Sequence, residues 1–167
     1  MLHPKQRQVL FGIGVVMAVA VAAPSPLGAF TVPTPSGFKI LYMFAGARDT
    51  TNAAINSAAT SVHCTNSDVS KDAAVIVEFV DFDNTPIVQL SATIGPQRTF
   101  TFSSQGTAFY AEDATASIAD DLNQGSVAVL GDRSSKKVIC TAVVIDPVNN
   151  PPTYIHTLPL YNSRAKF

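Results

Sequence analysis

The chain has 167 residues, a formal net charge of −1 at pH 7 and a hydrophobic content of 47%. Only 14% of its residues are charged, which excludes the strongly basic proteins that bind nucleic acids or anionic membranes through clustered Lys and Arg. Low charge and threonine-rich segments favour an extracytoplasmic β protein over a cytosolic helical one.

Residues 1–29 have the layout of a signal peptide and a short lead-in. Lys5 and Arg7 precede an apolar run of 15 residues from Val9 to Ala23. A helix that spans a bilayer needs about 20 residues, so this run favours a cleaved signal peptide over a membrane anchor. Small residues predict cleavage of the signal peptide near Ala22 or Ala29, and the sequence does not decide between these two sites.

The signal peptide predicts a protein that is secreted or exported to the periplasm or cell envelope, with no membrane contact after cleavage. Residues 30–167 are expected to form a single domain, because about 140 residues can bury a core of their own. Loss of Lys5 and Arg7 leaves nine basic and twelve acidic residues, a net charge of −3.

Apolar and polar residues alternate with the period of a β-strand along most of this domain. The predicted strands are 38–44, 60–65, 73–83, 88–94, 99–103, 107–111, 126–130, 138–145 and 153–160. Turn residues join 73–83, 88–94 and 99–103 closely enough to predict a meander. Residues 46–57 and 112–121 are expected to be loops, and Gly125 is expected to break the chain before a strand.

Residues 75–102 resemble the hairpin of secreted bacterial immunoglobulin-like domains of uncharacterised function. An aromatic-rich strand, Val77–Phe82, ends in a turn with Asp83 and Asn84, and Pro96 precedes the strand after next. The resemblance implies an all-β, antiparallel Ig-like β-sandwich of about 7–9 strands. It holds in the broad sense only, because the chain has no Trp and has Val138 where a tyrosine corner needs Tyr.

The two cysteines, Cys64 and Cys140, each lie in a predicted strand. In a short exported chain this predicts a structural disulfide, with free thiols and a metal or catalytic role as the alternatives. We expect the bond to cross the core, which would point Val138, Ala142 and Val144 inward with Cys140.

The remaining side chains of the Cys140 strand would then face outward. In an Ig-like order this strand would neighbour residues 75–82, and the two strands would share an apolar outer face. The face consists of Ile76, Val80, Phe82, Ile139, Val143 and Ile145. It is larger than a monomer normally exposes, which predicts cover by another protein, a second copy or another part of the chain.

No pattern for a metal or catalytic site stands out. His63 and His156 lack the spacing of zinc ligands. The acidic pairs are Asp81/Asp83, Glu112/Asp113 and Asp120/Asp121. The sequence does not decide whether Asp81 and Asp83 form a calcium site together with Glu112 or Asp120. The chain has no Gly-x-Ser-x-Gly motif, and we expect neither an enzyme nor a cofactor.

The sequence therefore predicts an exported structural or binding module that contacts another protein or a second copy through a sheet face. The alternatives are a small-ligand or carbohydrate binder that uses its end loops, and a hydrolase. Sugar binding needs aromatic platforms, and the chain offers only Tyr42, Tyr110, Tyr154 and Tyr161 besides Phe. This composition favours a protein partner.

Overall fold

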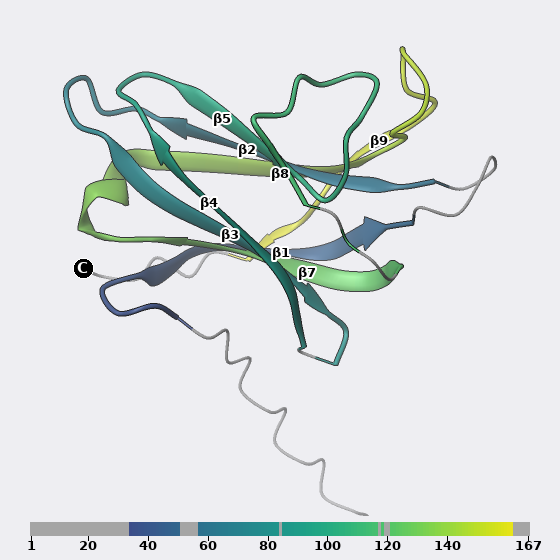
Figure 1. Ribbon diagram of the computed structural model, residues 1–167, viewed down its shortest axis with the longest axis horizontal. Helices are drawn as coiled ribbons and strands as arrows, with labels where there is room; N and C mark the ends of the chain where they lie inside the picture. The colour runs from purple at the N-terminus through teal and green to yellow at the C-terminus, as the bar shows by residue number, and fades with distance from the viewer. Residues whose placement is uncertain (1–33, 51–56, 84, 117, 119–120, 162–167) are drawn as a thin grey trace, which may run out of the picture.

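The computed structural model describes residues 34–50, 57–83, 85–116, 118 and 121–161. This part of the chain contains ten β-strands, one short 3-10 helix and no α-helix (Figure 1). None of its helices is long and apolar enough to cross a membrane. The predicted signal peptide and its cleavage sites lie outside the described residues.

The strands form two five-stranded sheets. The first has the order β10-β1-β7-β3-β4, and all its strands are antiparallel. The bounds of these strands, in sheet order, are Leu160–Tyr161, Lys39–Asp49, Leu122–Gly131, Ala73–Asp81 and Pro86–Ile94.

The second sheet has the order β6-β5-β2-β8-β9, and only the β5–β6 pair is parallel. The bounds, in sheet order, are Ala114–Thr115, Thr99–Ser103, Ala59–Asn66, Val138–Ile145 and Ile155–Thr157. The chain passes from β7 in the first sheet to β8 in the second through the 3-10 helix Arg133–Lys137.

The two sheets pack face to face around one apolar core. Phe79 and Val127 contribute to it from the first sheet, and Val62 and Phe102 from the second. All four are buried, as expected for strands whose apolar side chains alternate toward a partner sheet. The described chain is thus an all-β sandwich, with more strands than the 7–9 predicted from the sequence.

Several predicted elements differ from the observed ones. The strands at 99–103 and 138–145 have the predicted bounds. β1 extends into the predicted loop 46–57 as far as Asp49, and residues 107–111 do not form a strand. The predicted meander is wrong, because β5 pairs with β2 in the second sheet. The periodicity of a strand shows which side chains face the core, but not which sheet the strand joins.

The predicted disulfide between Cys64 and Cys140 is present, but its expected path across the core is wrong. The two residues lie directly opposite each other on the neighbouring strands β2 and β8, with Cα atoms 4.1 Å apart. The bond therefore staples two strands of one sheet. The inward direction of Val138, Ala142 and Val144 is confirmed, since all three are buried in the core.

Removal of the disulfide should destabilise the fold. Replacing both cysteines by alanine is expected to lower the free energy of unfolding by about 2–4 kcal/mol, because the unfolded chain gains freedom over a separation of 76 residues. Urea denaturation followed by circular dichroism measures the loss. Reduction of the unmodified protein should give a similar value, and equal stability of all three samples would contradict the prediction.

Gly125 does not break the chain but pairs within β7, opposite Ala47 on one side and Asp81 on the other. A Cβ atom there would lie 2.5 Å from the backbone oxygen of Val80 and 2.5 Å from Cδ1 of Leu122. The close approach of neighbouring backbone therefore requires glycine at this position.

Gly125→Ala is expected to destabilise the protein by about 1–3 kcal/mol, because the backbone of Val80 must shift. Gly106→Ala is a matched control, since no atom lies within 4 Å of its added Cβ, and it should change stability by less than about 0.5 kcal/mol. Thermal unfolding of both variants tests this, and equal midpoints would show that β7 tolerates the side chain.

Candidate functional site

The apolar face predicted from the sequence does not form. β3 and β8 lie in different sheets, so Ile76, Val80 and Phe82 are separated from Ile139, Val143 and Ile145 by the core. Val80 and Ile145 are buried, and Ile76 and Val143 are half-buried. Only Phe82 and Ile139 remain well exposed, at 76% and 59%. The prediction is wrong because it took the strand order of an Ig-like domain from local sequence.

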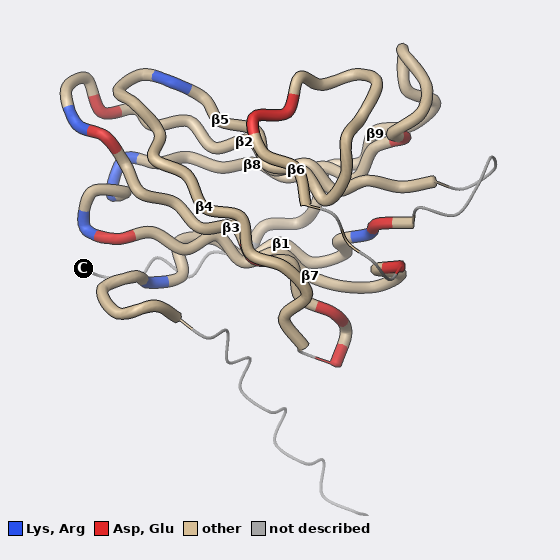
Figure 2. The backbone as a smooth tube through the Cα atoms, viewed as in Figure 1, with Lys and Arg blue, Asp and Glu red and all other residues tan. Residues whose placement is uncertain are grey.

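The candidate metal ligands are also dispersed. Asp81 and Asp83 lie at the β3–β4 turn, whereas Glu112 lies in the segment between β5 and β6; Figure 2 shows the acidic stretches of these two segments apart from each other. Asp120 is outside the described residues. In the described part of the chain, no three His, Cys, Asp or Glu side chains come together as metal ligands. His63 on β2 and His156 on β9 lie on strands that are not neighbours.

Two loops at one end of the second sheet are joined to each other. Residues 104–113 follow β5, and residues 146–154 connect β8 to β9. The amide of Ala108 donates to the carbonyl of Pro147 at 2.8 Å, and Nδ2 of Asn150 donates to the carbonyl of Ala108 at 3.1 Å. We call these segments the paired loops; they lie side by side near β9 in Figure 1.

The buried carboxylate of Asp146 organises the second of the paired loops. It accepts hydrogen bonds from the amides of Val148, Asn149 and Thr153 at 3.0, 3.4 and 3.0 Å. The side chains of Asn149 and Thr153 also donate to it, each at 2.7 Å. These donors favour the ionised carboxylate and hold the pKa of Asp146 far below its usual range. One side chain thus defines the course of the whole turn.

Acidic side chains anchor the first of the paired loops as well. Oε1 of Glu112 accepts from the amide of Thr107 at 2.9 Å, and from its hydroxyl. Oδ2 of Asp113 accepts from the amide of Thr101 on β5 at 2.8 Å. The hydroxyl of Thr107 accepts in turn from the amide of Tyr110 at 3.0 Å. Both loops are therefore held in one conformation by local hydrogen bonds.

Large apolar side chains project from these anchored segments. Phe109 is 42% exposed on the first loop, Val148 is 64% exposed on the second, and Ile155 is 43% exposed where β9 begins. We call these three residues the loop-tip surface. Apolar side chains on a pre-organised backbone can bind an apolar surface without a large loss of conformational entropy.

His63 lies beneath the first of the paired loops. The ring of Tyr110 packs edge-on against it with centroids 4.6 Å apart, and its Nδ1 lies 3.1 Å from Oγ1 of Thr101. Its Nε2 is buried and has no hydrogen-bond partner among the described residues. Burial lowers the pKa of His63, although the nearby charge of Glu112 acts in the opposite direction. A neutral imidazole therefore joins the loop to the sheet.

Two buried carboxylates lie away from the paired loops. Asp49, at the end of β1, is fully buried. Burial raises the pKa of Asp49. A hydrogen bond with the side chain of Ser104 lowers this pKa, and the negative charge of Asp121 raises it. On β3, Glu78 accepts from Nε2 of Gln89 at 2.8 Å, and burial raises its pKa too. Both groups favour the protonated form more than an exposed carboxylate does.

Sequence reasoning missed the loop-tip surface. The sequence pattern indicates only the end of a strand at Asp146 and predicts a strand at residues 107–111. A signal was present in the run Asp146-Pro147-Val148-Asn149-Asn150, where an apolar residue stands among turn-forming ones. An apolar side chain in such a turn has no core to enter, which indicates a contact surface.

Comparison with known proteins identifies no family. No family model matches the chain, and no curated protein matches it. A solved structure described as "Crystal Structure of Thermotoga maritima 1070" is similar at 12% identity and a TM-score of 0.47. The match covers 75% of this chain and 95% of that one.

The neutral state of His63 predicts a pH-dependent stability. Its lowered pKa means that the unfolded chain binds a proton there more readily than the folded chain. The contribution of His63 to stability is thus complete above its ordinary pKa of 6.5 and is lost as the pH falls below that value. Between about pH 7.5 and about pH 5, the protein should lose more stability than the His63→Gln variant.

Urea denaturation at several pH values measures this difference. Asp49 and Glu78 titrate in the opposite sense, but they are common to both proteins and cancel in the comparison. His156→Gln, at an exposed position, is the control for the substitution of a histidine by glutamine itself. Parallel pH profiles for the unmodified protein and His63→Gln would contradict a buried neutral imidazole.

Proposed function

We propose that the protein is an exported, non-enzymatic binding module that contacts another protein through the loop-tip surface. The observation that carries this proposal is the exposure of Phe109 and Val148 on loops whose backbone is held by Asp146, Glu112 and Asp113, next to the exposed Ile155 at the start of β9. Rigid apolar anchors of this kind dominate the energetics of protein interfaces. The paired loops replace the predicted sheet face as the contact region.

Export is supported by the chemistry of the cysteines. Both are in the disulfide, and such bonds persist in oxidising compartments such as the periplasm and the extracellular medium. The basic and apolar pattern of residues 1–23 supports the same compartment.

An Ig-like arrangement is supported by part of the strand pairing. If β2, β3, β4, β5 and β7 correspond to Ig strands B, C, C′, E and F, the pairs B–E, C–F and C–C′ have counterparts. The outer strands differ, since β1 pairs with β7 and β8 pairs with β2. In this proposal the protein is a variant of the Ig-like sandwich in which the first and last long strands exchange sheets.

A protein partner is favoured over a carbohydrate by the use of the tyrosines. The hydroxyl of Tyr42 donates to the carbonyl of Val138 at 2.7 Å, and that of Tyr154 to the carbonyl of Ser57 at 2.5 Å. Tyr110 packs on His63. These three side chains have structural partners and are half-buried, which leaves them poor platforms for a sugar ring.

Site-specific photocrosslinking tests the proposal. A benzoylphenylalanine at position 148 should form adducts with a different protein in the envelope or medium fraction. The matched control is position 69, because Val69 is 70% exposed on the β2–β3 loop at the opposite end of the sandwich (Figure 1). Adding Phe109→Ser should lower the yield at position 148 by roughly threefold or more, since an apolar anchor is lost.

Circular dichroism should show that the probes and Phe109→Ser leave the fold intact, because all these positions are exposed. Equal adducts at positions 148 and 69, or no adduct at position 148, would overturn the loop-tip surface as the contact region.

A further inference from the structure

β4 differs from the other edge strands of the two sheets, which are β10, β6 and β9. β6, β9 and β10 have two or three residues each. Short edge strands are one way in which proteins prevent the edge of a sheet from pairing with another chain. β4 has nine residues and contains no charged side chain. Its pairing with β3 is uninterrupted from Val88 to Ile94. Its other side, where no strand of the described chain pairs, presents a long regular row of backbone hydrogen-bonding groups.

The sandwich is also incompletely closed along β4. Val88, Leu90 and Ala92 face the core but are only half-buried, whereas Val75 and Val77 of the adjacent β3 are fully buried. In the second sheet, Phe100 of β5 and Ala114 of β6 are half-buried as well. A further strand beside β4 would cover the exposed parts of its three inward side chains.

We propose that β4 is a self-association edge, at which β4 of one copy pairs antiparallel with β4 of a second copy. The two five-stranded sheets then continue into each other. A twofold axis perpendicular to the joined sheet places the inward side chains of both strands on the same side. This inference uses a surface separate from the loop tips, so it goes beyond the proposed function and does not depend on it.

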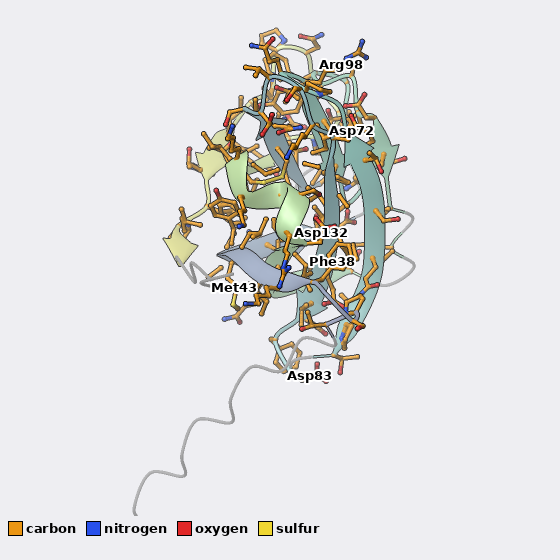
Figure 3. All side chains as sticks on the ribbon, turned by 90° about the vertical axis from the view of Figure 1, so that its left-hand side faces the viewer. Phe38, Met43, Asp72, Asp83, Arg98 and Asp132 are labelled. Atoms are coloured by element: carbon orange, nitrogen blue, oxygen red, sulfur yellow. A yellow bond between two sulfur atoms is a disulfide. The ribbon has the colours of Figure 1, made fainter. Side chains whose placement is uncertain are left out.

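The charges at the two ends of β4 are complementary in this arrangement. Asp81 and Asp83 lie at the β3–β4 turn. At the other end, the exposed Lys71 and Asp72 precede β3 and the exposed Arg98 lies in the β4–β5 turn, so two positive charges and one negative charge give this end a net charge of +1. Figure 3 shows Asp83 and Arg98 at opposite ends of the sheet. Neither forms an ion pair with any other residue that the structure describes. Antiparallel pairing brings the acidic end of each copy to the Arg98 end of the other, whereas parallel pairing would bring like charges together.

Phe82 and a shallow depression lie toward opposite ends of β4. Phe82, 76% exposed, projects beside the acidic end of β4. A shallow depression of about 320 Å³ lies toward the other end, and Phe38, Ile76, Ser91 and Thr93 are among its lining residues. Twofold pairing brings Phe82 of each copy toward the depression of the other. Each copy thus presents an exposed ring near one end of β4 and a depression toward the other.

Sedimentation equilibrium of the purified protein tests the inference. At about 50 μM the protein should have the mass of a dimer. Leu90→Lys places a charge in the middle of the paired strands and should weaken the dimer by at least about 100-fold. Phe82→Ser should weaken it by about tenfold. Ile139→Ser is the matched control, because Ile139 is exposed on the outer face of the second sheet, and it should leave the dimer unchanged.

A charge exchange distinguishes a specific dimer from a destabilised variant. Asp83→Arg and Arg98→Asp should each weaken the dimer by about five- to tenfold, as two exposed ion pairs are lost at once. The double variant should regain the original affinity. These residues lie at opposite ends of one copy, so only an intermolecular contact can produce the recovery.

A monomer at this concentration would overturn the inference. So would a dimer that Leu90→Lys and the charge variants leave unaffected while circular dichroism shows them folded. If Leu90→Lys does not fold, the charge exchange between Asp83 and Arg98 still tests whether the dimer forms through β4. A Val148→Ser variant should keep the dimer, which separates failure of this inference from failure of the proposed loop-tip contact.

Discussion

The pairing of β2 with β8 is the interaction on which the second sheet depends. Eight residues of each strand lie in register, and the disulfide joins them at Cys64 and Cys140. β2 also pairs with β5, and β8 with β9, so both paired loops begin from strands that this pair positions. Because the bond lies within one sheet, it stabilises the platform beneath the loops rather than the contact between the sheets. The contact between the sheets relies on packing in the core.

Acidic side chains of the second sheet act mainly through the backbone. Asp146, Glu112 and Asp113 each accept main-chain N–H groups and so replace regular secondary structure in the segments that connect the strands. Glu112, a candidate calcium ligand in the sequence, thus has a backbone partner in the fold. These hydrogen bonds also explain how segments without strands can hold apolar side chains in the solvent.

The side chains of the two proposed surfaces are exposed for different structural reasons. At the loop tips, Phe109 and Val148 lie on segments that form no strand, Ile155 lies at the start of β9, and all three are exposed. Along β4, the first sheet ends in a strand of full length, while the second ends in the two-residue β6. The inward side chains of β4 therefore lack cover on one side. A protein can use both surfaces at once, because they belong to different sheets.

The sequence by itself determined the all-β class, most strand positions, the cysteine pair and the inward row of the Cys140 strand. Each follows from local period or composition, because side chains alternate across a strand whatever lies beside it. Only the tertiary structure decided that β3 and β8 lie in different sheets, that the disulfide stays within one sheet, and that Gly125 lies inside β7. Partner choice among strands depends on long-range packing of the whole core, and similar apolar strands are interchangeable in a local pattern. For the same reason, the loop tips and the open side of β4 could be recognised only after the strands were placed.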